Sequence, residues 1–435
     1  MGEHGHSMTT ASDQATEERP RSGSTVDSAR AWIVVSAAFV STFTVFGIAY
    51  SFGAFFTSMA DEFGADSSAT SVFFAFTAFL YFLLGAITGP IGDRIGPRRV
   101  LIVGAVCMTV GLYATSRVHN LWLGYLTYGL GVGIGVACGY VPMVAAVGQW
   151  FERRRTAALG VAVAGIGVGT LITAPLAEWL IDHYGWRTTY VILAAGAAVA
   201  LGAASLGALR PPTQQADTPS PPASVKTLFK GREFRILYVS TFLMSLALFA
   251  PFVFMAGYMD SRGVSGSPAL IVGLIGAASV AGRLGLGALA ARTSAMWLFQ
   301  LSFLVLGLSL GVWLVAGDSY ALLVLFAVAL GVAYGGIIAL APAVVAELLG
   351  TSGLGAALGI LFTAAGLGGL IGPPAIGALI DGIGYRAGIS AALVVAMAAW
   401  MVVTRTNAGA PLLRRDLTNN LRKGSPCSSR GELSS

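Results

Sequence analysis

Long apolar segments alternate with short polar ones along most of the chain. Each apolar segment approaches the roughly 20 residues that a helix needs to cross a bilayer, although the third and the last are short. The pattern predicts twelve transmembrane helices, at residues 31–56, 71–90, 100–115, 121–149, 157–181, 189–209, 236–258, 269–291, 295–316, 320–348, 355–379 and 387–404. The one long polar break is rich in proline and basic residues and divides these spans into six and six.

An internal repeat relates the two sets of spans. Residues 157–187 align with residues 356–386 at a shift of 199. In that alignment a proline, aspartate, glycine and arginine series stays in register, with Pro175, Asp182, Gly185 and Arg187 matching Pro374, Asp381, Gly384 and Arg386. Parallel repeats around an axis along the membrane normal are a transporter architecture, with the substrate site between the halves near the midplane.

We therefore predict an all-α membrane protein whose twelve transmembrane helices form two parallel six-helix halves. The halves are residues 31–209 and 236–404, and residues 210–235 are a cytoplasmic linker. Residues 1–30 and 405–435 are polar, lack an apolar run and are predicted to be disordered cytoplasmic tails.

Composition excludes other classes of protein. Hydrophobic residues make up 55% of the chain and charged residues only 11%, against about 25% in soluble domains. The chain is too apolar for disorder, and too apolar for a nucleic-acid binder with a solvated basic face. Its three cysteines give no metal-ligand spacing and no disulfide framework, so we expect neither a metal nor a cofactor.

The net charge of +6 carries topological information. If both termini are cytoplasmic, the loops and tails on that side hold 21 of the 26 Lys and Arg residues, and the opposite loops hold four. The positive-inside rule then places both termini in the cytoplasm. We expect a multi-pass protein of the plasma membrane that contacts the lipid bilayer and functions as a monomer.

Several motifs resemble those of a known family. The segment 89–99, Gly-Pro-Ile-Gly-Asp-Arg-Ile-Gly-Pro-Arg-Arg, is similar to the major facilitator superfamily signature G-x-x-x-D-R-x-G-R-R. Segments 150–165 and 372–385 resemble the span-five and span-eleven motifs of the monocarboxylate transporter family, and segments 50–53 and 140–142 fit its first and fourth spans. The resemblance extends over nearly the whole chain and includes similarity to oxalate/formate exchangers.

The same motifs contain the residues that we expect to control conformational change. The resemblance implies that a contact of Asp93 stabilises an outward-open state, and a carboxylate there can accept hydrogen bonds from a helix N-terminus. The other candidates are Arg94, Arg98, Arg99, Arg153, Arg154, Pro373, Pro374 and Asp381. The alternatives are that the arginines serve topology alone and that the prolines only kink a helix. Glu178, near the outer end of span five, is interpreted as an edge salt bridge or a gate rather than as a proton site.

Arg283 is the most informative single residue, because it lies about fourteen residues into span eight. A charge near the membrane centre costs at least ~2.5–3.5 kcal/mol on insertion scales, and span eight contains no Asp or Glu. A guanidinium offers a forked pair of donors that matches a carboxylate. We predict that Arg283 binds the substrate carboxylate, and the resemblance implies the same. The alternative is a structural arginine that contacts aromatic rings or backbone carbonyls, or that snorkels to the interface.

Four further side chains are candidates for substrate binding, and each could instead be a packing residue: Tyr50, Tyr140, Ser279 and Tyr334. By the resemblance, animal-type members of the family carry an Asp at the position of Ser279 and a Lys near that of Ala54, and oxalate exchangers add a Lys in span eleven. One cavity cation indicates a monoanionic substrate. The missing Asp leaves both proton symport and exchange against a counter-anion open.

The expected function is secondary active transport of a small organic anion, with monocarboxylates such as lactate or pyruvate as substrates. Efflux of a drug or metabolite by a member of the same superfamily is one alternative, and a membrane sensor or receptor is another. An enzyme is not expected, because the four histidines lie in the N-terminal tail or near outer loops and no nucleophile, phosphate-loop or metal-ligand arrangement is present.

Overall fold

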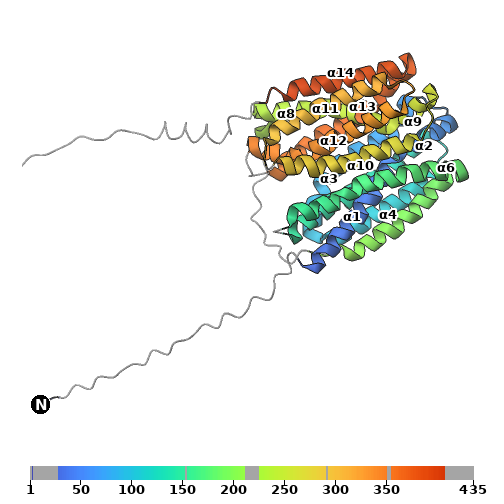
Figure 1. Ribbon diagram of the computed structural model, residues 1–435. Coiled ribbons are helices and arrows are strands. Elements are labelled where there is room, and N and C mark those ends of the chain that lie inside the picture. The colour runs from blue at the N-terminus through green and yellow to red at the C-terminus, as the bar shows by residue number, and fades with distance from the viewer. Residues whose placement is uncertain are drawn as a thin grey trace, which may run out of the picture.

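Long helices run side by side in the part of the chain that the structure describes (Figure 1). The computed structural model describes Gly2 and residues 28–151, 154–210, 225–290, 292–349 and 354–406. The helices in these residues are α1 (Ala29–Tyr50), α2 (Phe52–Phe63), α3 (Ser67–Ile95), α4 (Pro97–Thr115), α5 (Leu121–Trp150), α6 (Arg155–Gly207), α7 (Val225–Lys230), α8 (Arg232–Leu248), α9 (Ala250–Arg262), α10 (Pro268–Leu289), α11 (Ala295–Ala316), α12 (Tyr320–Leu349), α13 (Leu354–Ile383) and α14 (Tyr385–Val403).

The number of membrane crossings agrees with the prediction. Among the described residues, 11 helical segments are long and apolar enough to cross a membrane. One of them, of 51 residues, consists of two helices that meet at Gly185, where φ of 75° and ψ of 159° are not helical. Counted separately, these two helices bring the crossings to twelve. The predicted all-α membrane fold is therefore confirmed.

Several helices extend beyond the predicted apolar spans. Helix α3 covers Ser67–Ile95, where residues 71–90 were predicted. Its extra N-terminal turn is capped by Asp66, whose carboxylate accepts from the N–H of Ala69 at 2.7 Å. Helix α7 and the first turn of α8 lie within the segment predicted as linker. Hydropathy alone misses these ends because polar residues extend a helix beyond the hydrocarbon region.

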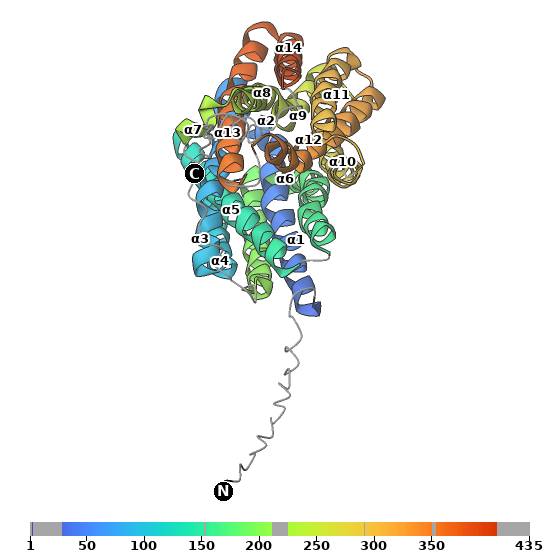
Figure 2. The same cartoon turned by 90° about the vertical axis from the view of Figure 1, so that its left-hand side faces the viewer.

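The helices form two groups with matching packing. In the first, α1 packs on α6, α3 on α5, and α4 on both α5 and α6; in the second, α8 packs on α13 and α14, α10 on α12, and α11 on both α12 and α14. The blue-to-green and yellow-to-red groups are separate blocks in the end-on view (Figure 2). Contacts of α3 with α13, α6 with α10 and α2 with α9 join the two halves.

The repeat extends to the backbone conformation of the turns. Gly64 after α2 and Gly263 after α9 have φ of 58° and 64°, while Gly185 and Gly384 have φ of 75° and 99°. Each pair is related by the same shift of 199 residues, and only glycine adopts positive φ without strain. We call the end of the bundle with these four turns the far face, and the opposite end, where α1 begins and α14 ends, the terminal face.

The first and seventh spans are each broken in the middle. Ser51 separates α1 from α2, and its hydroxyl donates to a carbonyl in the preceding turn at 2.9 Å. Phe249 separates α8 from α9, where Pro251 in the first turn of α9 lacks the N–H of a continuous helix. Just beyond the breaks, Gly53 of α2 lies directly against the backbone of Phe252 in α9. The two halves therefore meet where both spans bend.

Close packing inside the first half depends on glycine at the contact between α1 and α6. A Cβ atom on Gly169 would lie 2.9 Å from backbone carbon atoms of Phe43, which have no freedom to move aside. Small residues at such crossings let helix backbones approach in a membrane, where apolar burial between helices gives no net driving force.

We expect Gly169→Val to lower the stability of the purified protein by about 1–3 kcal/mol or more, because the new methyl groups overlap the backbone of α1. Thermal unfolding in detergent measures this loss. Gly196→Val is the matched control, since nothing lies within 4 Å of a Cβ atom there. Equal unfolding temperatures for the two variants would contradict the close contact.

Candidate functional site

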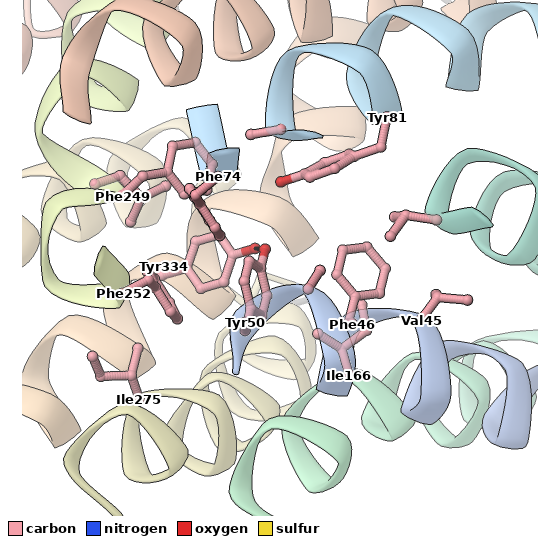
Figure 3. Close-up of a cluster of buried hydrophobic side chains, with 14 of the residues drawn as sticks. Val45, Phe46, Tyr50, Phe74, Tyr81, Ile166, Phe249, Phe252, Ile275 and Tyr334 are labelled. Carbon is pink, nitrogen blue, oxygen red and sulfur yellow. Dashed lines mark hydrogen bonds between the residues drawn. The ribbon is translucent and has the colours of Figure 1, made fainter. Parts of the chain in front are cut away.

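An aromatic layer crosses the middle of the bundle at the two broken spans. Tyr50, the last residue of α1, is 2% exposed, and its hydroxyl lies 3.1 Å from that of Tyr334 in α12. Phe252 of α9 stacks on the Tyr50 ring with 4.7 Å between the ring centres. Figure 3 shows these three side chains gathered together. We call Tyr50, Phe252 and Tyr334 the aromatic layer, and it joins the first half to the second.

Arg283 projects from α10 into the contact between the halves and is only 9% exposed. Its Nη1 donates to the carbonyl oxygen of Val163 in α6 at 3.2 Å, and its guanidinium carbon lies 5.6 Å from the centre of the Tyr334 ring. Its Nε and Nη2 are buried and have no hydrogen-bond partner in the described part of the chain. The contacts with the Val163 carbonyl and the Tyr334 ring therefore occupy only Nη1 of the guanidinium. The edge formed by Nε and Nη2 is available to bind a ligand.

Two further tyrosines approach this region from the first half. Tyr140 of α5 contacts Phe46 edge-on at 5.2 Å, and Tyr140 is also close enough to Arg283 for an electrostatic interaction. Tyr81 of α3 contacts Phe46 at 5.8 Å, and its buried hydroxyl has no hydrogen-bond partner among the described residues. That hydroxyl points toward the hydroxyls of the aromatic layer in Figure 3.

Sequence reasoning missed Tyr81, although it marked Tyr50, Tyr140 and Tyr334. Span two contains five Phe residues beside Tyr81, and no spacing rule separates an aromatic ring that faces the site from one that packs elsewhere. Ser279 lies near the site, but its hydroxyl already has a hydrogen-bond partner in its own helix. Its hydroxyl donates to the Gly276 carbonyl of its own helix at 2.7 Å. The structure therefore brings the tyrosines and Arg283 together and holds the Ser279 hydroxyl within α10.

Two cavities lie on opposite sides of the aromatic layer. The outer vestibule, of about 350 Å³, is lined by α2, α6, α9 and α10 toward the far face, and its lining includes Phe252, Glu178, Asp182 and Asp260. The inner chamber, of about 40 Å³, is lined mainly by the end of α8 next to the break at Phe249 and by the terminal-side halves of α12 and α13, and its lining includes Tyr334. Because each cavity has a layer residue in its lining, the aromatic layer separates the two.

Two carboxylates join the halves at the far face. Asp381 of α13 accepts hydrogen bonds from the backbone N–H groups of Ser67 and Ser68, at 3.1 and 3.0 Å, where α3 begins. Glu178 of α6 accepts from the hydroxyl of Ser267 and from the backbone of Ala269, where α10 begins. A carboxylate is favourable at a helix N-terminus because of the unsatisfied amides and the helix dipole. We call these two contacts the far-face latches.

The predicted prolines lie beside the first latch. Pro374 accepts a hydrogen bond from the Ser68 hydroxyl at 2.9 Å, so its carbonyl adds to the contact between α13 and α3. Pro373 and Pro374 both lie inside the helix α13, which continues through them. Gly377 brings the helices close, since a Cβ atom there would lie 2.8 Å from the Ser68 backbone.

The signature motif lies at the terminal face. Asp93 accepts a hydrogen bond from the Gln149 side chain at 3.1 Å, which ties the end of α3 to the end of α5 within one half. Arg210, which was not among the predicted residues, donates to the Ile95 carbonyl at 2.7 Å and covers the turn of the motif. The predicted arginines that the structure describes are exposed: Arg94, Arg98, Arg99 and Arg154. Arg153 lies outside the described residues.

Comparison with known proteins agrees with this architecture. The family model of the Major Facilitator Superfamily matches residues 38–317 and 296–431. The chain is 31% identical to Monocarboxylate transporter 13 of Rattus norvegicus over 360 residues, 80% of this chain and 82% of the relative. It is 30% identical to Monocarboxylate transporter 3 of Rattus norvegicus over 368 residues, covering 81% and 74%. It is also 29% identical to Agnestins efflux protein AgnL12 of Paecilomyces divaricatus over 378 residues, covering 86% of each.

Two related six-helix halves with a polar site between them define a membrane transporter. The chain belongs to the major facilitator superfamily and, within it, to the monocarboxylate transporter family. The family predicted from the motifs is therefore confirmed.

The hydroxyl pair of the aromatic layer should show energetic coupling, because each partner loses the same bond. We expect Tyr50→Phe and Tyr334→Phe each to lower stability by about 0.5–1.5 kcal/mol, and the double variant to lower it by little more than one of them. Thermal unfolding of the purified variants tests this, with Tyr113→Phe as a control whose ring is 49% exposed. Fully additive effects would show that the two hydroxyls act independently.

Proposed function

We propose that the protein is a secondary active transporter of small monocarboxylates such as lactate or pyruvate, and that Arg283 binds the substrate carboxylate. The observation that carries the proposal is the buried guanidinium edge, Nε and Nη2, which has no partner among the described residues. A carboxylate presents two oxygens at the spacing of that edge. It also supplies the negative charge that a buried arginine needs, since an uncompensated buried charge is strongly destabilising.

The surroundings of Arg283 favour a single negative charge on the substrate. Arg283 is the one basic residue in the interior of the described spans, since Arg187 and Arg262 lie at helix ends. The hydroxyls of Tyr140 and Tyr334 supply further hydrogen-bonding groups near the guanidinium, while their rings keep the site largely apolar. A small monocarboxylate fits one fixed charge, whereas a dicarboxylate would bring a second charge without a partner.

Efflux of a metabolite is the second candidate function, and it is supported by one observation. A relative with 86% coverage of both chains is named an efflux protein, while the relatives named monocarboxylate transporters support the first candidate. The two candidates share the fold and the carboxylate-binding role of Arg283 and differ in substrate and direction of net flux. Transport measured in both directions across vesicles separates them.

In this proposal the two halves rock against each other and expose Arg283 alternately to the two faces of the membrane. The basic terminal face is cytoplasmic by the positive-inside rule, and the membrane is the plasma membrane. The coupled species is either a proton that travels with the substrate or a counter-anion, since Ser279 stands where the resemblance implies a carboxylate. The protein works as a monomer.

Replacing Arg283 tests the proposal directly. We expect Arg283→Ala to lower uptake of labelled lactate or pyruvate into reconstituted vesicles by about 10- to 100-fold, because hydrogen bonds to a charged group contribute about 1.5–3 kcal/mol. Arg283→Lys should retain only part of the activity, since an ammonium keeps the charge and loses the forked geometry. Uptake with and without a pH gradient distinguishes proton coupling from exchange.

Arg117→Ala is the control, because that exposed arginine lies after α4 at the far face. It should transport as the unchanged protein does. Normal uptake by a well-expressed Arg283→Ala variant would contradict the assignment of the carboxylate site.

The far-face latches supply the gate of this cycle. Both hold a carboxylate of one half against a helix start of the other, and α6 with α10 is the repeat equivalent of α13 with α3. They must open before a substrate reaches the aromatic layer from the far face. Asp381 and Glu178 therefore act as gating residues, and Asp93, with the arginines of its motif, belongs to the terminal face.

A cysteine in the outer vestibule can report latch opening. In a variant without the three native cysteines, Thr57→Cys should react with a membrane-impermeant maleimide about 10-fold faster once Asp381→Asn and Glu178→Gln are added, because each change weakens charge-assisted hydrogen bonds. Asp182→Asn is the control, since Asp182 is the repeat counterpart of Asp381 and lines the same vestibule. Equal labelling rates in all variants would rule out the latches as the gate.

A further inference from the structure

The inner chamber is an apolar recess whose wall includes Tyr334, the ring next to Arg283 in the proposed carboxylate site. Its walls come from four helices of the second half and from Phe82 of α3 in the first half. The side chains that close it are mainly rings and branched aliphatics, among them Phe249, Phe303, Ile338 and Leu361. Its hydroxyls are few, and that of Tyr334 is already bonded to Tyr50. A polar or charged group would find almost no partner inside.

Tyr334 connects this chamber to Arg283. The guanidinium lies 5.6 Å from the Tyr334 ring, and the same ring forms part of the chamber wall. Arg283 lies in the terminal-side half of α10. The chamber is lined from the same side, by α8, which runs from the terminal face to the break at Phe249, and by the terminal-side halves of α11, α12 and α13, so both lie on the same side of the aromatic layer. A molecule whose carboxylate rests on Arg283 therefore has the chamber within reach of its other end.

The size of the chamber limits what it can hold. A water-sized group needs roughly 10–15 Å³ of such volume, and the chamber provides about 40 Å³. It has room for about three carbon-sized groups by this measure, which matches a short branched alkyl chain. Protein interiors are close-packed, so a void of this size near a buried cation with two nitrogens that lack a partner in the described residues is better explained as substrate space than as loose packing.

The other cavity does not compete for this role. The outer vestibule is larger, but Glu178, Asp182 and Asp260 line it, and their negative charge disfavours an anion. The inner chamber, in contrast, has an apolar wall that includes Tyr334, the ring next to the Arg283 guanidinium.

We propose that the inner chamber binds the hydrocarbon end of the substrate, so that the preferred substrates are monocarboxylates with a short branched apolar chain rather than lactate or pyruvate themselves. This inference rests on the proposed carboxylate site at Arg283. Burial of each additional CH₂ group in the chamber tightens binding by about four-fold. A 2-oxo acid with an isobutyl chain therefore binds at least about 10-fold more tightly than pyruvate.

Binding to the purified protein tests the inference with a series of 2-oxo acids: pyruvate, 2-oxobutanoate, 3-methyl-2-oxobutanoate, 4-methyl-2-oxopentanoate and phenylpyruvate. Dissociation constants come from ligand-dependent shifts of thermal unfolding. We expect affinity to rise to 4-methyl-2-oxopentanoate and to fall for phenylpyruvate, whose ring exceeds the chamber. The amide of 4-methyl-2-oxopentanoate, which lacks the charge, should bind at least about 10-fold more weakly than the acid.

Filling the chamber should remove the preference without removing the carboxylate site. Ala341→Leu and, independently, Ala365→Leu add side-chain volume from α12 and α13. Each should reduce the advantage of the branched acid over pyruvate from about 10-fold to less than about 3-fold, while pyruvate binding stays within about 2-fold. Ala174→Leu, which fills part of the outer vestibule, is the matched control and should keep the full preference. Pyruvate binding also reports that each variant is folded.

The outcomes separate the two proposals. If pyruvate binds and affinity does not rise along the series, the chamber assignment is wrong and the carboxylate site stands. If affinity rises equally in the chamber-filling variants, the apolar chain binds elsewhere and the chamber assignment is again wrong. If no acid in the series binds, or if Arg283→Ala binds them all unchanged, the proposed function fails and the chamber proposal fails with it.

Discussion

Inside a bilayer no water is available to pair with backbone groups, so every amide and carbonyl must find its partner within the protein. This constraint dictates the helices, and it also determines how they pack. Lipid tails are as apolar as leucine, so helices associate through close contact, and glycines such as Gly169 and Gly377 allow backbone to meet backbone. The rigid halves that result hold the Arg283 guanidinium between them, with one nitrogen bonded to the Val163 carbonyl.

The breaks in the first and seventh spans bring polar side chains to the centre of a bundle of otherwise regular helices. At Ser51 and Phe249 the helices end and restart, which the membrane tolerates only where neighbouring protein covers the backbone. Tyr50 of the first half and Phe252 of the second come directly from these breaks, and Tyr334 of the second half meets Tyr50. Because of the repeat, equivalent bends in the two halves meet and form one layer between the two cavities.

Charge is distributed unequally along the axis of the bundle. The terminal face carries most of the arginines and lysines, the outer vestibule carries carboxylates, and Arg283 lies between them. An anion approaching from the terminal face meets a favourable potential, whereas one from the far face passes Glu178, Asp182 and Asp260. Closure of the far face uses one of these carboxylates, Glu178, together with Asp381, so the same chemistry that repels an anion also joins the halves.

The sequence by itself determined the class of protein, the twelve crossings, the repeat and the singular position of Arg283. Hydropathy and charge are sums over neighbouring residues in the chain, so the features that depend on them can be predicted without knowing how the helices pack. Helix ends and the short helix α7 were less predictable, because they depend on caps and on polar residues outside the hydrocarbon region.

Only the tertiary structure decided which polar groups are satisfied. The Ser279 hydroxyl bonds to its own helix, and Asp381 pairs with a helix start more than 300 residues away in the chain. Tyr81 near the site and Arg210 at the terminal face are contacts that the sequence did not predict. The structure also showed that one nitrogen of Arg283 is bonded, while the other two have no partner among the residues that the structure describes. Hydrogen bonding and cavity shape depend on distances between helices that are remote in sequence, and no local pattern encodes those distances.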